Sequence, residues 1–320
     1  MQKNIVLCFD KNFIIPIATL LKSIELSNAN ETFVIHIVTA DLPDESKIKF
    51  EQNINKDVFS LVYHHIDDSI LKFCPIRPGD YVNIATYFRI LLPSILPSDL
   101  DKVLYLDGDM IVVDKLNYLW ELDMNNYGAA VVPCIHYGNP DEFKRLGLNK
   151  TEGYFNAGFM FINLKFWRDN DIQNKTLKYI QDYPDRCKKH DQDALNYTLS
   201  DKLLYISTRY NHQRIFYEKD FKFSEKLIGD VEESKMNPVI IHYCDLEKPW
   251  HYECFHPLKK VWDIFAKKLP AYKVKKSYKY KGIRKLKFII KNCILSKNKS
   301  TVEYTMNFEE LNKKLLEKFN

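Results

Sequence analysis

Glycine and proline are scarce in this chain of 320 residues, which contains nine glycines and 13 prolines. This composition excludes collagen-like and low-complexity classes of protein. The seven cysteines are odd in number and scattered, and no two of them form a CxxC pair. The pattern argues against a disulfide framework and against a zinc ribbon, so we expect reduced thiols in the core or at the surface.

Long apolar runs are missing as well, because no stretch of the sequence reaches the length that spans a membrane. The first ten residues, "MQKNIVLCFD", lack the apolar region and the small-residue cleavage site of a signal peptide. We therefore expect them to form a first β-strand, and we expect a cytoplasmic protein.

The chain does contain enough apolar residues, 46%, for a sizeable core, and its charge is unevenly distributed. Between residues 259 and 299 there are fifteen Lys or Arg and one acid, whereas the rest of the chain carries 32 basic and 41 acidic residues. We therefore predict an acidic body, residues 1–270, and a basic extension, residues 271–320, that attaches to an anionic partner.

Apolar and amphipathic segments alternate along the first part of the chain. Strands are expected at residues 4–9, 32–40, 59–66, 103–106 and 110–113, and helices at 14–27, 44–54 (with Asp44 as N-cap) and 83–96. After Gly128 the pattern is mixed. The alternation predicts an α/β fold with a mainly parallel, doubly wound sheet. In such sheets ligands bind beyond the carboxyl ends of the strands, where Asp10 and Asp107 fall.

Two carboxylates, Asp107 and Asp109, follow a predicted strand in the stretch "YLDGDMIVVD". Oxygen ligands on alternate residues can chelate a hard cation such as Mn²⁺ or Mg²⁺. Gly108 between them is expected to let the backbone turn so that both carboxylates point the same way. Asp114 adds a third acid that we place near the same edge. The alternative interpretation is an ordinary solvated Asp-Gly turn.

A histidine, His242, closes the predicted strand in "VIIHYCDLEKPW". An imidazole is a suitable third ligand for Mn²⁺, and Lys248 supplies a cation for a phosphate. The alternatives are a hydrogen-bonded core histidine and an ordinary surface lysine.

Two further stretches carry polar side chains next to predicted elements. In "YFNAGFMFINL", Asn156 can hydrogen-bond a hydroxyl-rich ligand, or it can simply belong to a turn that starts a strand. In "KHDQDALN", Asp191, Gln192 and Asp193 open a predicted helix. Asp191 suits an N-cap, so this stretch alone does not require a chemical role.

Six blocks in this order, "CFDKN", "TYFRI", "YLDGDMIV", "YFNAGFMFINL", "HDQDALN" and "HYCDLEKPW", resemble the retaining glycosyltransferases of family 8. That family includes bacterial lipopolysaccharide galactosyl- and glucosyltransferases and, more distantly, glycogenin. The resemblance covers residues 4–262. It implies a GT-A fold and transfer of a hexose from a UDP-sugar, with retention, to a glycan or lipid-linked saccharide acceptor. It also implies Mn²⁺, with Mg²⁺ as the alternative ion.

The resemblance assigns roles to individual positions. It implies metal binding by Asp107, Asp109 and His242, nucleotide binding by Asp10, Asn12, Gly108 and Lys248, and donor-sugar binding by Arg89, Asn156, Asp191 and Gln192. Asp191 and Gln192 are also the residues expected nearest the anomeric carbon, hence catalytic. One departure is Asp245, which replaces the glycine that the family usually has after "HYC". An acid beside a diphosphate is unfavourable unless it points away or pairs with Lys248.

The basic extension contains "KGIRKLKFIIKNCIL", which fits an interfacial helix on anionic lipid. The alternative is a solvated charged extension. We therefore predict peripheral attachment at the inner face of the cell membrane. The final segment, "NFEELNKKLLEKF", predicts an amphipathic helix that can self-associate into a homo-oligomer. No recognition motif accompanies the lysines, so nucleic acid is not an expected partner.

Two other functions remain open on the sequence. A sugar nucleotidyltransferase needs a glycine-rich phosphate loop after the first strand, and "CFDKNFIIP" has none. A non-catalytic nucleotide- or metal-binding protein would use the same polar residues without transfer. Release of UDP from a UDP-sugar distinguishes both from a transferase.

Overall fold

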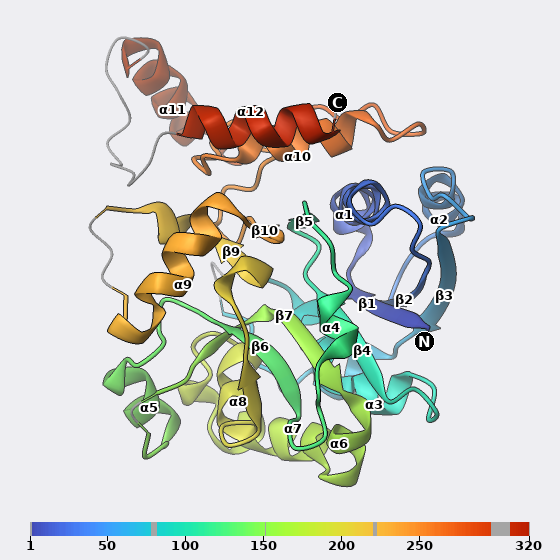
Figure 1. Cartoon of the computed structure of the whole chain (residues 1–320), viewed down its shortest axis with the longest axis vertical. Coiled ribbons are helices and arrows are strands. Elements are labelled where there is room, and N and C mark those ends of the chain that lie inside the picture. Colours follow the sequence, from blue (N-terminus) through green and yellow to red (C-terminus); the bar gives the residue numbers. More distant parts are fainter. Residues whose placement is uncertain (1, 78–81, 151, 220–222, 296–307, 320) are drawn as a thin grey trace.

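The computed structural model describes residues 2–77, 82–150, 152–219, 223–295 and 308–319, and within these ranges a large mixed sheet forms the centre of the molecule (Figure 1). Its seven strands lie in the order β3-β2-β1-β4-β7-β6-β8. They are β1 (Lys3–Cys8), β2 (Phe33–Thr39), β3 (Phe59–His65), β4 (Lys102–Leu106), β6 (Ala129–Pro133), β7 (Phe155–Asn163) and β8 (Leu203–Tyr205). The first four are parallel, and β7 runs opposite to its neighbours β4 and β6. The predicted α/β fold with a mainly parallel sheet is confirmed.

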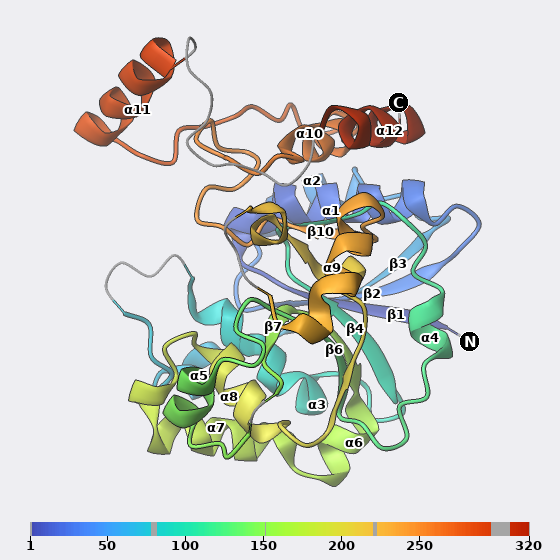
Figure 2. The same ribbon diagram turned by 60° about the vertical axis from the view of Figure 1, so that its left-hand side comes forward.

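Helices cover both faces of this sheet (Figures 1 and 2). On one face lie α1 (Ile14–Ser27), which follows the short turn η1 (Lys11–Phe13), and α2 (Asp44–Glu51). On the other face lie η3 (Ile84–Leu91), α3 (Leu92–Ile95), α6 (Leu164–Asp169), α7 (Ile172–Asp182) and α8 (Asp191–Thr198). Each layer buries a separate apolar cluster against the sheet, because neighbouring residues of a strand point to opposite faces.

A second, smaller sheet has the strand order β5-β10-β9. Its strands are β5 (Met110–Val112), β9 (His212–Gln213) and β10 (Ile240–His242). The remaining elements of the body are α4 (Tyr118–Glu121), α5 (Pro140–Leu146), α9 (Glu225–Met236) and the short turns η2 (Asp68–Leu71), η4 (Pro184–Arg186), η5 (Thr208–Asn211) and η6 (Arg214–Tyr217). Because β5 continues directly from β4, the small sheet is tied to the carboxyl end of the main one.

The C-terminal part begins with α10 (Lys259–Lys267) and continues to α11 (Gly282–Leu295) and α12 (Phe308–Phe319). The views of Figures 1 and 2 place α12 alongside α10, whereas α11 projects from the molecule. Leu311, Leu315 and Phe319 of α12 are buried in one apolar cluster with residues of α10. The apolar face expected to self-associate is therefore covered by the same chain. Among the described residues, every helix is too short or too polar to cross a bilayer.

Helix boundaries differ from the sequence predictions where prolines and caps intervene. The helix expected at residues 83–96 is a 3₁₀ helix, η3, followed by the short α3. Pro93 has no N–H to bond the carbonyl of Arg89, so a continuous α-helix is interrupted there. Asp44 is the first residue of α2 rather than its N-cap, which is Pro43.

Candidate active site

A cavity of about 480 Å³ opens beyond the carboxyl ends of β1 and β4. Almost all of the residues expected to bind metal, nucleotide or sugar line it: Asp10, Arg89, Asp107, Gly108, Asp109, Asn156, Asp191, Gln192, His242 and Lys248. The exception is Asn12, which is exposed and lies beside the cavity, where its main-chain and side-chain nitrogens donate to the Asp10 carboxylate over 2.8 and 3.1 Å. The expectation that Asp10 and Asp107 share one edge of the sheet is confirmed.

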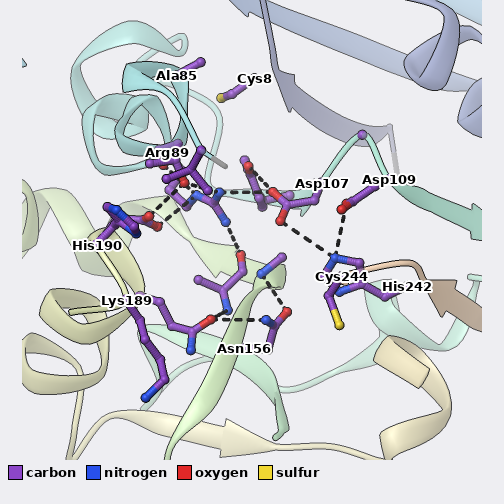
Figure 3. A pocket seen from close by; sticks show the side chains of 18 of the residues that line it. Cys8, Ala85, Arg89, Asp107, Asp109, Asn156, Lys189, His190, His242 and Cys244 are labelled. Carbon is purple, nitrogen blue, oxygen red and sulfur yellow. Dashed lines mark hydrogen bonds and ion pairs between the residues drawn. The ribbon is translucent and has the colours of Figure 1, made fainter. Parts of the chain in front are cut away.

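Strand pairing brings the two aspartates to a histidine that lies 133 residues beyond Asp109 in the chain. Asp107, Gly108 and Asp109 form the link between β4 and β5, and Met110 of β5 pairs with His242 of β10. The main chain continues this pairing, since Tyr243 N donates to Asp109 O over 2.9 Å. One ligand atom from each of the three side chains lies within 4.8 Å of the others (Figure 3).

The donor set of this group suits a divalent cation. Asp107 presents Oδ2 at 4.0 Å from His242 Nε2, while its Oδ1 accepts a hydrogen bond from Tyr105 Oη at 2.7 Å. Arg89 holds the same Oδ1 at 3.1 Å. One oxygen of Asp107 is thus fixed by protein donors and the other faces the imidazole. Two carboxylates and one imidazole, with an outer shell that orients them, fit a site for Mn²⁺ or a similar ion.

Asp109 is buried, and each oxygen of its carboxylate contacts one basic side chain. Its Oδ2 lies 2.6 Å from Lys248 Nζ and its Oδ1 lies 3.1 Å from His242 Nε2. Burial raises the pKa of Asp109, but Lys248 and His242 outweigh it, and the net effect lowers the pKa. Lys248 is only 8% exposed and also donates to the carbonyl of Tyr243, so it is not an ordinary surface lysine.

Arg89 is a buried cation between two acids. Its Nε lies 3.0 Å from Asp191 Oδ2, and its Nη1 donates to the carbonyl of Ala157 over 2.5 Å. Burial lowers the pKa of Arg89, but Asp107 and Asp191 outweigh it and raise the pKa. For Asp191 burial is the larger effect, so its pKa is raised although Arg89 opposes the shift.

The interpretation of Asp191 as an N-cap is wrong. Helix α8 begins at Asp191, its N-cap is His190, and no cap bond comes from that side chain. The Asp191 carboxylate instead accepts from Thr86 Oγ1 at 2.9 Å, in addition to the ion pair with Arg89. The Asp193 carboxylate accepts a hydrogen bond from the main-chain N–H of Lys189, four residues earlier, over 2.6 Å. His190 has a positive φ of 56°, a strained conformation at the edge of the cavity.

Asn156 and Gln192 form a pair of amides on one wall of the cavity. Asn156 lies within β7 rather than in a turn before it. Its Nδ2 donates to Gln192 Oε1 over 3.1 Å, and the main-chain N–H of Ala157 donates to the same oxygen over 3.2 Å. The two amides are therefore held in fixed orientations, as recognition of sugar hydroxyls requires.

Gly108 and Gly158 are needed for space. The main chain turns at Gly108 and both carboxylates point into the same group, as expected. The φ of Gly108 is not in the left-handed region, so the turn itself does not require glycine. A Cβ at Gly108 would lie 2.9 Å from Ile17 Cδ1. A Cβ at Gly158 would lie 2.5 Å from His242 Cε1 and 2.8 Å from Asp107 Oδ2.

One acid lies elsewhere than expected, and a second has another partner than the one considered. Asp114 is not among the described residues that line the cavity, and it lies 3.5 Å from Lys318 and 3.7 Å from Arg209. Asp245 pairs not with Lys248 but with Arg214, whose Nε and Nη2 lie 2.6 and 3.3 Å from its carboxylate.

The sequence analysis missed two residues that contact the metal-ligand group. Tyr105 bonds Asp107, and Asn211 bonds His242 Nδ1 through its side-chain oxygen at 2.8 Å. Tyr105 lies two residues before Asp107, so in a strand both side chains point to the same face, which offered a weak signal for this contact. A single asparagine in a 3₁₀ turn offered none for the second.

A mainly parallel sheet with a carboxylate pair and an imidazole beyond its strand ends defines a glycosyltransferase of the GT-A class. The sequence model of glycosyl transferase family 8 matches residues 4–254. The chain belongs to this family, as the six blocks predicted.

Several known proteins are similar to this chain. General stress protein A of Bacillus subtilis (strain 168) is 28% identical over 262 residues, which cover 80% of this chain and 90% of that protein. Lipopolysaccharide 1,3-galactosyltransferase of Salmonella typhimurium is 26% identical over 264 residues, covering 80% and 75%. The crystal structure of galactosyltransferase LgtC with donor and acceptor sugar analogs matches with a TM-score of 0.77, 26% identity, and coverage of 83% of this chain and 96% of that one.

Proposed function

We propose that this glycosyltransferase transfers galactose or glucose from a UDP-sugar to a saccharide acceptor, with retention and with Mn²⁺ as its metal. The observation that carries the proposal is the group of Asp107, Asp109 and His242 within 4.8 Å, beside the buried ammonium of Lys248. A cluster of this kind suits a nucleoside diphosphate together with a divalent cation. A lipopolysaccharide galactosyltransferase among the relatives supports a hexose donor and a lipid-linked saccharide acceptor.

The nucleotide would lie between Asp10 and Lys248. Asp10 accepts from Asn12 and from Asn83 Nδ2, which lies 2.6 Å away, so its carboxylate is fixed for a ribose or uracil partner. Gly108 lines the cavity between the two aspartates, so its main chain would face the nucleotide. Lys248 would meet the diphosphate, and the ion pair of its ammonium with Asp109 supports this role.

The difficult step is departure of UDP, on which negative charge accumulates as the bond from the anomeric carbon breaks. The cation would supply neutralisation of that charge as a Lewis acid. Lys248 contributes a second positive charge to the same leaving group. Asp191 and Gln192 would flank the anomeric carbon as it becomes oxocarbenium-like. The negative charge of Asp191 and the amide dipole of Gln192 would then stabilise the positive charge that develops on this carbon.

Retention requires either a covalent intermediate or attack from the side of the leaving group. The Asp191 carboxylate is 2% exposed, with Oδ1 bonded by Thr86 and Oδ2 in an ion pair with Arg89. Attack by this carboxylate would have to break a buried ion pair, which favours the second route. In that route the acceptor oxygen bonds the anomeric carbon on the face that UDP leaves. Its proton passes to the departing phosphate oxygen.

The proposal is tested by release of UDP from UDP-galactose and UDP-glucose, with and without Mn²⁺. Asp107→Asn and Asp109→Asn should each lower Mn²⁺-dependent turnover by at least about 100-fold, because the amide loses the charge that holds the cation. Asp114→Asn, outside the cavity, should turn over normally. Near-normal turnover of either cavity variant would refute the metal assignment.

The same experiment separates the competing functions. A sugar nucleotidyltransferase would release pyrophosphate from UTP and a sugar phosphate. A nucleotide-binding protein would bind the UDP-sugar and release nothing. Either outcome would replace the transferase proposal.

We also propose that residues 1–270 carry the transfer site while 271–320 attach the enzyme to an anionic membrane at the inner face of the cell membrane. Ile283, Leu286 and Ile290 share one face of α11 and are 73, 56 and 48% exposed. Lysines flank this face, and exposed apolar residues among cations suit a lipid interface.

A liposome test keeps the whole chain, since α12 packs on α10 and its removal would expose the body. Replacing Ile283 and Leu286 by Ser should reduce sedimentation with anionic vesicles at least threefold and leave UDP release unchanged. Ile48→Ser, which removes an apolar side chain that is 62% exposed on α2, is the matched control. Unchanged binding of the Ile283/Leu286 variant would contradict attachment through α11.

A further inference from the structure

Asn211 is completely buried at the end of η5, between the metal-ligand histidine and the amide pair of the cavity wall. Its Oδ1 lies 2.8 Å from His242 Nδ1, and its Nδ2 donates to Asn156 Oδ1 over 2.9 Å. Asn156 in turn bonds Gln192. One side chain therefore joins the group expected to hold a cation to the group expected to hold a sugar.

Main-chain N–H groups fix the direction of every bond in this series. Gly158 N donates to Asn156 Oδ1 over 3.1 Å, and a main-chain N–H can only donate. The oxygen of Asn156 therefore faces both Gly158 and Asn211, so the Asn211 atom that reaches it is the NH₂ group. The Asn211 oxygen is then the atom that faces His242, and the N/O assignment of the amide is not arbitrary.

An amide oxygen only accepts, so Nδ1 of His242 carries a proton, and the neutral imidazole therefore presents the lone pair of Nε2. Nε2 lies 3.1 Å from Asp109 Oδ1. An imidazolium would donate to this carboxylate, whereas in the neutral ring the lone pair and the carboxylate oxygen both face the position that a cation would take. The hydrogen bond from Nδ1 thus selects the form of the imidazole that can ligate a metal.

We propose that Asn211 is a positioning residue that holds His242 in the Nδ1–H tautomer and couples this ligand to the Asn156–Gln192 pair. Movement of the imidazole is then transmitted to the amides that would contact the donor sugar. The second half of this inference rests on the proposed function, whereas the tautomer is a property of the protein alone. Asn211 touches neither nucleotide nor sugar in this arrangement, so it is not a catalytic residue.

The alternative is that Asn211 only satisfies buried polar atoms. A purely structural role predicts that its loss lowers stability and nothing else. Asn28 provides the matched control, because it is also completely buried and both ends of its amide are bonded, to Leu116 N at 2.9 Å and Ser27 Oγ at 2.9 Å. It is not among the described residues that line the cavity.

The first measurement needs no mutation. Side-chain ¹⁵N NMR of the metal-free full-length protein, recorded well above the ordinary pKa of histidine, reports which ring nitrogen of His242 carries the proton. The His242→Gln spectrum assigns the signal by its disappearance. We expect the proton on Nδ1, and a proton on Nε2 would overturn the inference.

Variants then separate the two bonds. Asn211→Leu removes both bonds, so His242 should no longer have a single tautomer. The affinity for Mn²⁺, measured by calorimetry without nucleotide, should fall about 10- to 100-fold.

Asn211→Asp keeps an acceptor for His242 but has no donor for Asn156. It should retain the tautomer and Mn²⁺ affinity within about threefold, while kcat for UDP-sugar hydrolysis falls about tenfold. Asn28→Leu should lose stability and change neither the tautomer nor Mn²⁺ affinity.

The outcomes are distinct. An Asn211→Leu protein with the wild-type tautomer and wild-type affinity refutes the positioning role, as does an Asn28→Leu protein that loses affinity equally. If Asn211→Leu does not fold, the wild-type tautomer and Asn211→Asp still decide. A wild-type protein that shows the Nδ1–H tautomer but binds no Mn²⁺ refutes the proposed function and leaves the tautomer assignment standing.

Discussion

The chemistry of individual residues depends on the close packing of the side chains in the site. Gly158 lies between Asp107 and His242, and an added Cβ would meet atoms of both. Arg89 separates Asp107 from Asp191, and Lys248 offsets Asp109. The three acids can lie this close because each has a cation against it, which removes the repulsion that bare carboxylates would suffer.

Gly158→Ala should disable the site without unfolding the protein. Its Cβ would lie 2.5 Å from His242 Cε1, so the imidazole or Asp107 must shift. We expect Mn²⁺-dependent UDP release to fall about 10- to 100-fold, by analogy with loss of ligand orientation. Gly229→Ala in α9 is the control, since its Cβ meets no atom of the described chain within 4 Å and alanine favours a helix. Equal activity of the two variants would contradict this account of Gly158.

Arg214→Gln should weaken donor binding through Asp245. Asp245 follows Cys244, which lines the cavity, and its charge is matched by Arg214 at 2.6 Å. Without that partner the carboxylate would repel a diphosphate, so KM for the UDP-sugar should rise about fivefold, roughly 1 kcal/mol, with kcat little changed. Adding Asp245→Asn should restore KM. Failure of the double variant to recover would show that Arg214 acts in another way.

At the scale of elements, two strand pairings create the site. Register between β5 and β10 sets His242 beside Asp109, and register between β4 and β7 sets Gly158 beside Asp107. A slip of one residue in either pairing would turn the ligand to the other face. The packing of α12 on α10 is a further contact between elements that are distant in the sequence. Its contribution to the free energy of unfolding can be measured.

Leu315→Ala should lower the free energy of unfolding by about 2–4 kcal/mol, because it removes a buried side chain from the interface between α12 and α10. Urea titration measures the change. Lys313→Ala, whose side chain is 76% exposed, should be nearly neutral. If α12 instead served self-association, Leu315→Ala would shift the sedimentation coefficient toward a smaller species rather than lower the stability of a monomer.

The elements were the part of the structure most accessible from sequence. Strands such as β1 and β2 are continuous apolar runs buried on both faces, so their pattern is distinct. Asp107, Asp109 and His242 were found because each follows or closes such a run. Asn211 was not, since its partners are set by a turn and by two strands distant in sequence. The pairing of Arg214 with Asp245 was hidden for the same reason.

The stability of the entire fold comes from two apolar clusters on opposite faces of the sheet and from a third that joins α10 to α12. One histidine of the central sheet, His36, is buried as well. His36 on β2 is 4% exposed, with Nδ1 3.0 Å from His64 Nε2 and Nε2 3.1 Å from Asn4 Oδ1. Burial, aided by the neighbouring His64, lowers the pKa of His36 to about 4.

The fold should therefore lose stability as the pH falls from about 6.5 to about 4. In this window the unfolded chain binds the proton and the folded chain does not, so protonation favours unfolding. The contribution of His36 is on the order of 3 kcal/mol at the acid end. Urea titrations at several pH values measure it. His36→Gln should reduce the pH dependence by its own contribution, whereas His65→Gln, on the exposed end of β3, should leave the dependence unchanged. An identical pH dependence in His36→Gln would contradict this assignment.

The separation of 133 residues between Asp109 and His242 also has a consequence for biosynthesis. At roughly 5–20 residues per second, a ribosome delivers the histidine on the order of ten seconds after the aspartate. During that interval the emerging chain has the parallel strands of its N-terminal half but no complete chelating triad. A site with all three side chains therefore forms only after residue 242 has been made, and the early strands must pair without it.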